Sequence, residues 1–522
     1  MISHRGLHNY PVRRSVARRR GSYPTRNHCK FGCRRPSARR RGGTDTQSAD
    51  RVSAMRGESA RLVLLVVIAL RFTISSGFIQ HLSSLARISL LEMAQEDDDT
   101  SPQEETRKRF RSFRDGARLR RALGITRVLL LSDVHTDYEA NRKFLGRIAG
   151  SDGSDGAGTM IIIAGDVSHD LEYLRWTLRK LRRHFDMVVY TPGNHELWLD
   201  KGRRQMPGKG DGCSNSIEKL EKVLELCIDE DICIGPVQIG DVGNELLVLP
   251  LLSWHHQAFD TEPAIDPTCW SKIPNATKVI VDYRRTSWPG LSALDVNDSV
   301  AEYIDSLNDS ILDMQQIKDA LRQSPMSLLT VSHFLPRIEL IPEKRYLTLP
   351  TLHSCVGSVF LEERVRALHE VLRPRDNNVD GDCNHMHAFG HSHLSWDAVH
   401  AGIRYVHSPL AYPKEWEYRR GSLEIGSMRG ESSDKRYPVS IWEANKGFPS
   451  HWLGGWWSRY YSLMPRRPER TKYLAPWVAR RYQQQEDGIV EEFDHLTVEK
   501  ALSFGSNQRD SWKLNNTNPS NF

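Results

Sequence analysis

Several common signals are missing from the 522-residue sequence, and each absence narrows the possibilities. Its eight cysteines are scattered and no two of them form a C-x-x-C pair, so they fit a reducing compartment better than a disulfide framework. The longest uninterrupted apolar run, Leu62–Leu70, has nine residues, whereas a membrane-spanning helix needs roughly 20. No internal repeat is evident. The hydrophobic content of 39% is nevertheless enough to build an ordinary core.

Positive charge is also scarce where a nucleic-acid-binding surface would need it. The formal net charge is +7, but residues 1–60 alone hold 15 Lys/Arg and 3 Asp/Glu. The remainder holds 57 basic and 62 acidic residues, a net charge of −5. Because the basicity belongs to the N-terminal tail, the rest of the chain gives no signal for binding nucleic acid.

Residues 1–120 are expected to lie outside the fold, as a disordered or targeting-like extension and linker. The sequence before Met55 is Arg-rich and acid-poor. From Met55 to Phe78 it looks like a signal peptide, with a charged start, an apolar stretch and small residues near its end. Localisation therefore stays open between the cytoplasm and an organelle.

From about Ile125, apolar runs of strand length alternate with helical patterns. Strands are expected at 127–131, 160–164, 187–190, 245–252, 327–331, 387–389, 403–407 and 439–442, and helices at 171–184, 216–229, 299–323 and 358–372. This rhythm predicts an α/β domain over 125–445 with at least partly parallel strands. Residues 446–522 form a Trp/Arg-rich C-terminal extension, which either packs on the domain or binds a partner or a membrane surface.

Short polar motifs follow five of the expected strands. They are Asp133-Val134-His135, Gly165-Asp166, Gly193-Asn194-His195-Glu196, Ser332-His333 and Gly390-His391-Ser392-His393. In α/β sheets, ligand sites gather outside the carboxyl ends of the strands. A lone histidine is more often a surface or core residue than a ligand, but five motifs in order after five strands indicate one shared site.

This set of motifs resembles the calcineurin-like metallophosphoesterase superfamily, whose pattern reads D-x-H, G-D, G-N-H-E/D, a later His, and G-H-x-H. The match spans about residues 125–445. The stretches SHFLPRIELIPEKRYL, IRYVHSPLAYPKEW and LAPWVARRY are similar to an uncharacterised plant and algal branch. Ser392 stands where Thr is frequent in the family. The resemblance implies an α/β fold, in which two mixed β-sheets form the inner layers of a four-layer α/β/β/α sandwich. It also implies that the metals lie at one edge of the sheets.

The resemblance also implies a site for two metal ions. Asp133, His135 and His393 would bind the first ion, Asn194, His333 and His391 would bind the second, and Asp166 would bind both. These donors are imidazole, carboxylate and amide groups without a thiolate, a set that suits Mn, Fe or Zn. A hydroxide bridging the two ions would attack phosphorus in line, and His195 would act as the catalytic acid on the leaving oxygen.

Three other residues have two interpretations each. Arg337 could bind a substrate phosphate, because its planar guanidinium matches phosphate oxygens, or it could be a solvated loop residue. His255, in the loop Trp254–Ser292, could line the substrate pocket or be a chance loop histidine. Asp137 could bond to a ligand histidine or cap the helix that follows.

The sequence therefore predicts a metal-dependent hydrolase of phosphate esters that acts on a small phosphorylated substrate. A nuclease or a protein phosphatase would use the same site, although the net charge of −5 outside the tail disfavours a nuclease. A non-catalytic scaffold of the same fold would show broken motifs, and here every motif is present. The sequence indicates no nucleic-acid or protein partner and leaves the oligomeric state open.

Overall fold

The computed structural model describes residues 102–149, 156–199, 211–291, 299–372, 383–416, 438–451 and 453–491. All of them belong to one compact unit that begins at Asp98. The expected N-terminal signal-like segment lies outside the described residues, as does most of the loops Gly202–Gly212 and Arg373–Cys383. Within the described ranges, every helix is too short or too polar to cross a lipid bilayer, and all six cysteines there are free thiols.

The first sheet has four strands in the order β12-β2-β3-β4. They are β2 (Arg127–Leu131), β3 (Thr159–Ala164), β4 (Met187–Thr191) and β12 (Val439–Glu443). β2, β3 and β4 run parallel, and β12 is antiparallel to β2. β3 is buried along its whole length, as expected for a parallel strand that is covered on both faces.

The second sheet has seven strands in the order β1-β5-β6-β8-β9-β11-β10. They are β1 (Arg120–Ala122), β5 (Val237–Ile239), β6 (Leu246–Pro250), β8 (Ser327–Val331), β9 (His385–Phe389), β10 (Trp396–His400) and β11 (Ile403–His407). The central strands β6, β8, β9 and β11 are parallel, whereas β5 and β10 are antiparallel to their neighbours β6 and β11. Both sheets are therefore mixed, as predicted.

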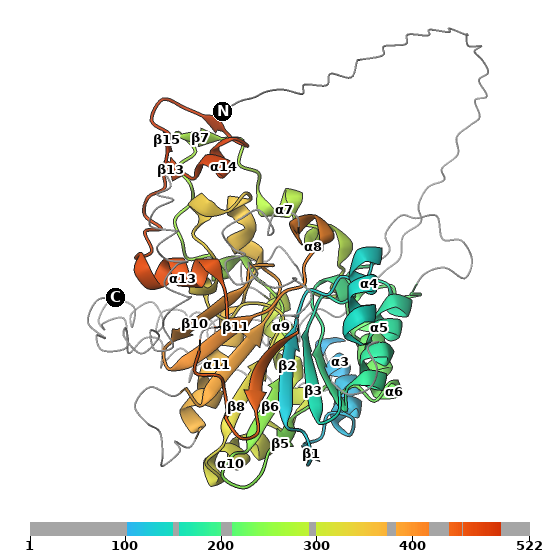
Figure 1. Ribbon diagram of the computed structural model, residues 1–522. Helices are drawn as coiled ribbons and strands as arrows, with labels where there is room; N and C mark the ends of the chain where they lie inside the picture. Colours follow the sequence, from blue (N-terminus) through green and yellow to red (C-terminus); the bar gives the residue numbers. More distant parts are fainter. Residues whose placement is uncertain are drawn as a thin grey trace, which may run out of the picture. The chain divides into compact units, whose positions relative to one another are not determined.

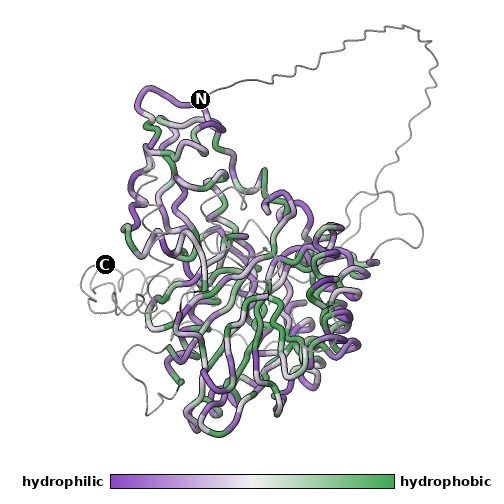
Figure 2. The backbone as a smooth tube through the Cα atoms, viewed as in Figure 1, coloured by the Kyte–Doolittle hydropathy of each residue, from purple (hydrophilic) through white to green (hydrophobic). Residues whose placement is uncertain are grey.

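The two sheets face each other across one hydrophobic layer. Side chains alternate along a strand, so Val128 and Leu130 of β2 and Ile162 of β3 enter this layer from the first sheet. Val248 of β6 and Leu329 of β8 enter it from the second sheet. Figure 2 shows hydrophobic residues concentrated along these central strands.

Helices cover the outer faces of the sheets. α4 (Glu139–Ile148), α5 (Leu171–His184) and α6 (Ser216–Asp229) lie along the four-stranded sheet (Figure 1). The second set of helices is α9 (Ser299–Ile311), α10 (Met314–Gln323) and α11 (Val359–Val371). Their apolar residues share one cluster with Leu247 and Leu328 of the seven-stranded sheet. The predicted four-layer α/β/β/α sandwich is confirmed.

Two predictions about helices and boundaries were wrong. The single helix expected at 299–323 breaks into α9 and α10, because the Asp313 side chain caps α10 by accepting a hydrogen bond from Gln316 N at 3.0 Å. The segment before 120 is also not wholly outside the fold. α3 (Pro102–Phe110) and the 3₁₀ turn η1 (Arg111–Arg114) pack against α9, and Phe110 is fully buried.

The remaining elements are short. They are the 3₁₀ turns η2 (His195–Leu197), η3 (Gln257–Phe259), η4 (Ile338–Leu340), η5 (Lys344–Tyr346) and η6 (Pro350–Cys355), the helices α7 (Ala276–Val279), α8 (Asp282–Arg285), α13 (Trp456–Leu463) and α14 (Pro476–Ala479), and the strands β7 (Trp270–Ser271), β13 (Tyr473–Leu474), β14 (Gln483–Gln484) and β15 (Ile489–Val490). The described part of the C-terminal extension packs on the domain: Trp477 Nε1 donates to Tyr346 O at 2.9 Å, and Tyr461 OH accepts from Glu343 N at 3.0 Å.

Candidate metal centre

The candidate centre lies where strands of both sheets end. β2, β3 and β4 are parallel, so the segments that follow them leave the same edge of their sheet. β8 and β9 also end level, with Val331 opposite Ala388. The two edges meet, because Ser132 after β2 forms a β-bridge with Pro409 after β11. The structure brings all seven sequence-predicted ligands together there: Asp133, His135, Asp166, Asn194, His333, His391 and His393.

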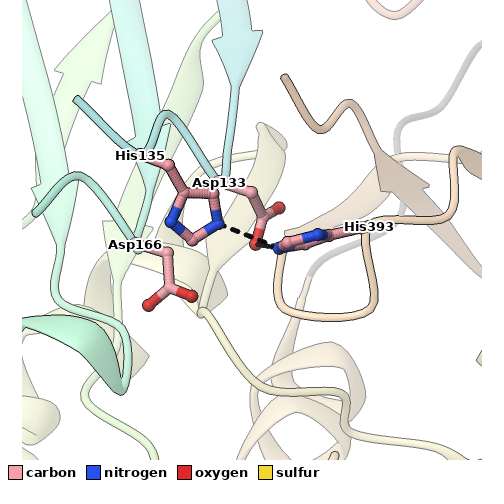
Figure 3. Close-up of side chains that lie close together, drawn as sticks. All are labelled: Asp133, His135, Asp166 and His393. Carbon is pink, nitrogen blue, oxygen red and sulfur yellow. Dashed lines mark hydrogen bonds and ion pairs between the residues drawn. The ribbon is translucent and has the colours of Figure 1, made fainter. Parts of the chain in front are cut away.

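The first group of donors is Asp133, His135, Asp166 and His393 (Figure 3), whose candidate ligand atoms all lie within 4.8 Å of one another. His393 Nε2 is 2.9 Å from His135 Nε2 and 3.5 Å from Asp133 Oδ1. Two imidazole nitrogens and two carboxylates that converge in this way could hold one metal ion.

The second group contains Asp166, His333 and His391, again with donor atoms within 4.8 Å of one another. Asn194 Oδ1 joins them, at 3.0 Å from His333 Nε2 and 3.1 Å from His391 Nδ1. Asp166 Oδ1 lies 3.3 Å from His333 Nε2. Asp166 therefore belongs to both groups, and it is the residue through which the two groups adjoin.

The backbone around these side chains is strained. Positive φ angles occur at Asp133 (52°), His135 (44°), Asp166 (54°), His391 (74°) and His393 (57°). Each such non-glycine residue costs on the order of 1 kcal/mol or more, and strain of this kind clusters at functional sites.

Space at the centre is tight, which explains two motif glycines. A Cβ added at Gly193 would lie 2.3 Å from Asp166 Oδ1, and one at Gly390 would lie 2.7 Å from His333 Nδ1. Neither position can carry a side chain unless a candidate ligand moves. The glycines of the G-N-H-E and G-H-x-H motifs are therefore required by close approach.

The electrostatics of the centre favour a cation. Burial alone would raise the pKa of Asp133 and Asp166, but the neighbouring histidines outweigh burial and hold the pKa of each carboxyl well below its usual range. Burial lowers the pKa of His391 to about 3, so its nitrogen lone pairs are available. Burial also lowers the pKa of His333, but Asp166 overrides that effect and raises it to about 9. Two buried negative charges therefore face the donor nitrogens, and a metal ion would neutralise them.

Glu196, the last residue of the G-N-H-E motif, holds two of the ligand loops together. It is fully buried and accepts hydrogen bonds from four backbone N–H groups, on Asp166 (3.2 Å), Val167 (2.5 Å), Ser168 (3.1 Å) and Gly193 (2.7 Å). The loop after β3 is thereby tied to the loop after β4. Sequence reasoning assigned this residue no role.

Two further residues orient candidate ligands and were also missed. His407 Nε2 lies 2.9 Å from Asp133 Oδ2, and Glu415 Oε2 lies 2.8 Å from His393 Nδ1. Second-layer partners of this kind fix the tautomer and the orientation of metal ligands. His407 ends the predicted strand 403–407, so the strand-end rule could have found it. Glu415 lies eight residues further along the chain, where that rule gives no signal.

His195, the predicted acid, lies beside both groups. Its Nε2 is 3.7 Å from Asp166 Oδ2 and 3.3 Å from the hydroxyl of Tyr412. Its ring lies against Trp198, with ring centroids 3.6 Å apart. Burial lowers the pKa of His195, although Asp166 opposes that effect. The Tyr412 ring also lies against His135, with centroids 4.3 Å apart and planes tilted by 33°. Sequence reasoning missed this residue.

Arg337 and His255, the two residues expected to contact the substrate, both interact with carboxylates of the chain. Arg337 makes ion pairs with Glu362 at 2.6 Å and Glu339 at 2.8 Å, so its charge is already matched by two carboxylates. His255 is buried, and its Nε2 lies 3.2 Å from Asp282 Oδ2. Asp282 in turn accepts a hydrogen bond from Asn194, a donor of the second group, so His255 is linked to that group through Asp282.

Asp137 takes neither of its two expected roles. Its Oδ1 lies 2.9 Å from His169 Nδ1 and accepts from Ser168 Oγ at 2.8 Å. The residue at the start of α4 is Tyr138, which makes no side-chain cap. Asp137 therefore fixes the loop after β3 and caps no helix.

Comparison with known proteins finds a family match over part of the chain. Residues 126–288 match the family model for calcineurin-like phosphoesterases. This part of the chain is therefore similar to the calcineurin-like phosphoesterases. A 68-residue stretch is 40% identical to the [acyl-carrier-protein] phosphodiesterase PptH of Mycobacterium tuberculosis, covering 13% of this chain. The chain spans 20% of the length of that relative.

Two solved structures are similar to this chain. The crystal structure of the phosphopantetheinyl hydrolase PptH from M. tuberculosis matches with 19% identity over 57% of this chain and 94% of that one, at a TM-score of 0.36. A putative 5′-nucleotidase from Staphylococcus aureus in complex with alpha-ketoglutarate matches with 14% identity over 54% of this chain and 48% of that one, at a TM-score of 0.23. The family match ends at residue 288, so the later donors His333, His391 and His393 are placed by the structure alone.

Proposed function

We propose that this protein hydrolyses phosphate esters at a centre of two metal ions. The observation that carries the proposal is the sharing of Asp166 between two convergent groups of donors. Asp133, His135 and His393 would hold one ion, and Asn194, His333 and His391 would hold the other. A carboxylate has two oxygens and can serve both ions.

The donor chemistry fits Mn, Fe or Zn. Imidazole nitrogens suit Fe and Zn, carboxylate oxygens suit Mn, and no thiolate is present among the seven donors. When bound, a pair of such ions clamps the oxygens of a phosphate ester and lowers the pKa of a water molecule.

The chain itself would supply proton transfer and positioning. His195 Nε2 would give its proton to the leaving oxygen, since it lies beside Asp166 and is held by Trp198. The Tyr412 hydroxyl, 3.3 Å from that nitrogen, would keep the ring directed at the reacting group. Glu196 and His407 would keep the ligand loops and Asp133 in place.

The substrate class is a small phosphorylated molecule. The likeness to a phosphodiesterase is a reason to test diesters beside monoesters. A nuclease is the weaker alternative, because the chain outside the first 60 residues carries a net charge of −5.

The test uses the full chain loaded with Mn²⁺ or Zn²⁺, assayed with p-nitrophenyl phosphate and bis-p-nitrophenyl phosphate, with metal content measured on the same samples. Asp166→Asn should lose bound metal and at least about 10²-fold in kcat, since it serves both ions. Asp319→Asn, at a half-exposed carboxylate on α10, is the matched control and should change neither. Absence of both bound metal and turnover would overturn the proposal and favour the non-catalytic scaffold.

A further inference from the structure

Asp282 is a buried carboxylate that contacts Asn194, a member of the second group of donors. It begins α8, inside the loop Trp254–Ser292, and is 2% exposed. Its Oδ1 accepts two hydrogen bonds, from Asn194 Nδ2 at 2.8 Å and from Trp198 Nε1 at 2.6 Å. Its Oδ2 lies 3.2 Å from His255 Nε2.

The contact with Asn194 decides which atom of the amide faces the donors. An ionised carboxylate can only accept hydrogen bonds, so it selects the NH₂ end of the Asn194 side chain. The carbonyl Oδ1 is thereby directed at His333 Nε2 and His391 Nδ1. Since only the carbonyl end of an amide is a metal ligand, the orientation that Asp282 imposes is the one that a metal requires.

The contact with Trp198 concerns the acid. The indole N–H is donor only, and its bond to Asp282 fixes the plane of the ring. His195 lies against that ring at 3.6 Å between centroids and 31° between planes. A single oxygen, Asp282 Oδ1, therefore accepts hydrogen bonds both from the candidate ligand Asn194 and from Trp198, the ring against which the candidate acid lies.

We propose that Asp282 is a positioning residue that couples the second metal to the catalytic acid, by holding the Asn194 amide and the Trp198 ring from one carboxylate oxygen. The proposal rests on the two-metal function above. It gives the loop Trp254–Ser292 a role in building the centre. His255 completes the arrangement by standing against the second oxygen of Asp282.

The first test is metal stoichiometry of the full chain, by equilibrium dialysis against Mn²⁺. Asp282→Ala removes the acceptor, and Asp282→Asn keeps a carbonyl oxygen that can take its place. Wild type and Asp282→Asn should bind two Mn²⁺ per chain. Asp282→Ala should keep the first ion and bind the second about 10- to 100-fold more weakly, the usual cost of losing a second-layer partner. If Asp282→Ala unfolds, Asp282→Leu, which fills the volume without accepting a hydrogen bond, takes its place.

The second test follows the acid. Trp198→Phe keeps a ring beneath His195 but loses the N–H, and it leaves the bond between Asp282 and Asn194 intact. It should keep both ions and lose rate on phenyl phosphate, whose leaving oxygen needs a proton, far more than on p-nitrophenyl phosphate. Equal losses on both esters would overturn the coupling, and so would two tightly bound ions in Asp282→Ala. A wild-type chain that binds no metal would instead refute the proposed function, and this proposal with it.

Discussion

At the scale of single residues, Glu196 is the side chain outside the seven donors whose loss should most disturb the loops that carry them. Four buried N–H groups donate to it, from the loops after β3 and β4. A buried donor left without a partner costs about 1–3 kcal/mol. We expect Glu196→Ala to lower the free energy of unfolding by at least about 3 kcal/mol, measured by urea denaturation.

The conservative variant separates hydrogen bonding from volume. Glu196→Gln keeps one acceptor oxygen and nearly the same shape, so it should lose less than Glu196→Ala. Burial raises the pKa of Glu196 to about 7, so the neutral form is accessible near neutral pH and a neutral amide is a fair substitute. Equal stability of wild type and Glu196→Ala would show that the loops do not depend on this clamp.

At the scale of secondary-structure elements, β9 carries two fully buried histidines that are not candidate ligands. His387 lies between two hydroxyls, with Nδ1 2.9 Å from Thr330 Oγ1 and Nε2 3.0 Å from Ser332 Oγ. His385 Nε2 lies 2.9 Å from the same Thr330 oxygen. These contacts join β8 to β9 and need neutral rings, and burial lowers the pKa of His387 to about 3.

This arrangement predicts acid sensitivity. Between pH 6.5 and about 3 the unfolded chain binds a proton at His387 and the folded chain does not. The free energy of unfolding should therefore fall as pH drops below 6.5, by up to about 1.4 kcal/mol per pH unit for this group. His387→Gln should make the slope shallower, in denaturation curves recorded from pH 7 to 5. His451→Gln, at an exposed residue, should leave the slope unchanged, and identical slopes in all three proteins would contradict the assignment.

α3 shows where sequence reasoning about elements stops. Its nine residues, PQEETRKRF, contain one large apolar side chain, so composition marks the segment as linker. Phe110 is nevertheless fully buried in the core. We expect Phe110→Ala to cost about 3–5 kcal/mol of stability, whereas Lys108→Ala on the exposed face should cost less than about 0.5. Urea denaturation of both variants decides whether the segment belongs to the folded unit.

The central strands of both sheets and the motifs that follow them were predictable from local patterns, whereas β1, β5 and β10 were not expected. The assignment of seven donors came from the family resemblance of those motifs. Apolar runs such as RVLLL and MIIIA are long enough to identify a strand, and each motif follows one directly. Asp282 could not be found in this way. It sits in an irregular loop, 88 residues after the Asn194 that it orients, and only the folded chain brings the two together. The break between α9 and α10 was missed for a simpler reason, since Asp313 as a cap interrupts an otherwise continuous apolar pattern.

At the scale of the whole molecule, the described part of the C-terminal extension is fastened by buried charges. Arg345 is 4% exposed and lies between Glu343 (2.5 Å) and Glu491 (2.7 Å). Removing one partner of a buried charge is costly, so Glu491→Ala should lower stability by about 1–3 kcal/mol. Asp487→Ala, 76% exposed and 4.0 Å from Lys472, should change it by less than about 0.5 kcal/mol. Similar melting temperatures for the two variants would show that this end of the chain contributes nothing to the fold.

The proposed metals would bridge the two sheets. Asp133, Asp166 and Asn194 follow strands of the first sheet, whereas His333 and His391 follow strands of the second. Without metal, Asp133 and Asp166 remain as buried charges that only the histidines can offset. A ligand that binds the folded state alone adds about 2.7 kcal/mol at 100 times its dissociation constant. We therefore expect a chelator to lower the melting temperature of wild type by several degrees, and added Mn²⁺ to restore it. The Asp166→Asn variant should have the same melting temperature with and without chelator, since it would have no metal to lose. A wild-type melting temperature that does not respond to chelator would mean that the two sheets are held together by their apolar layer alone.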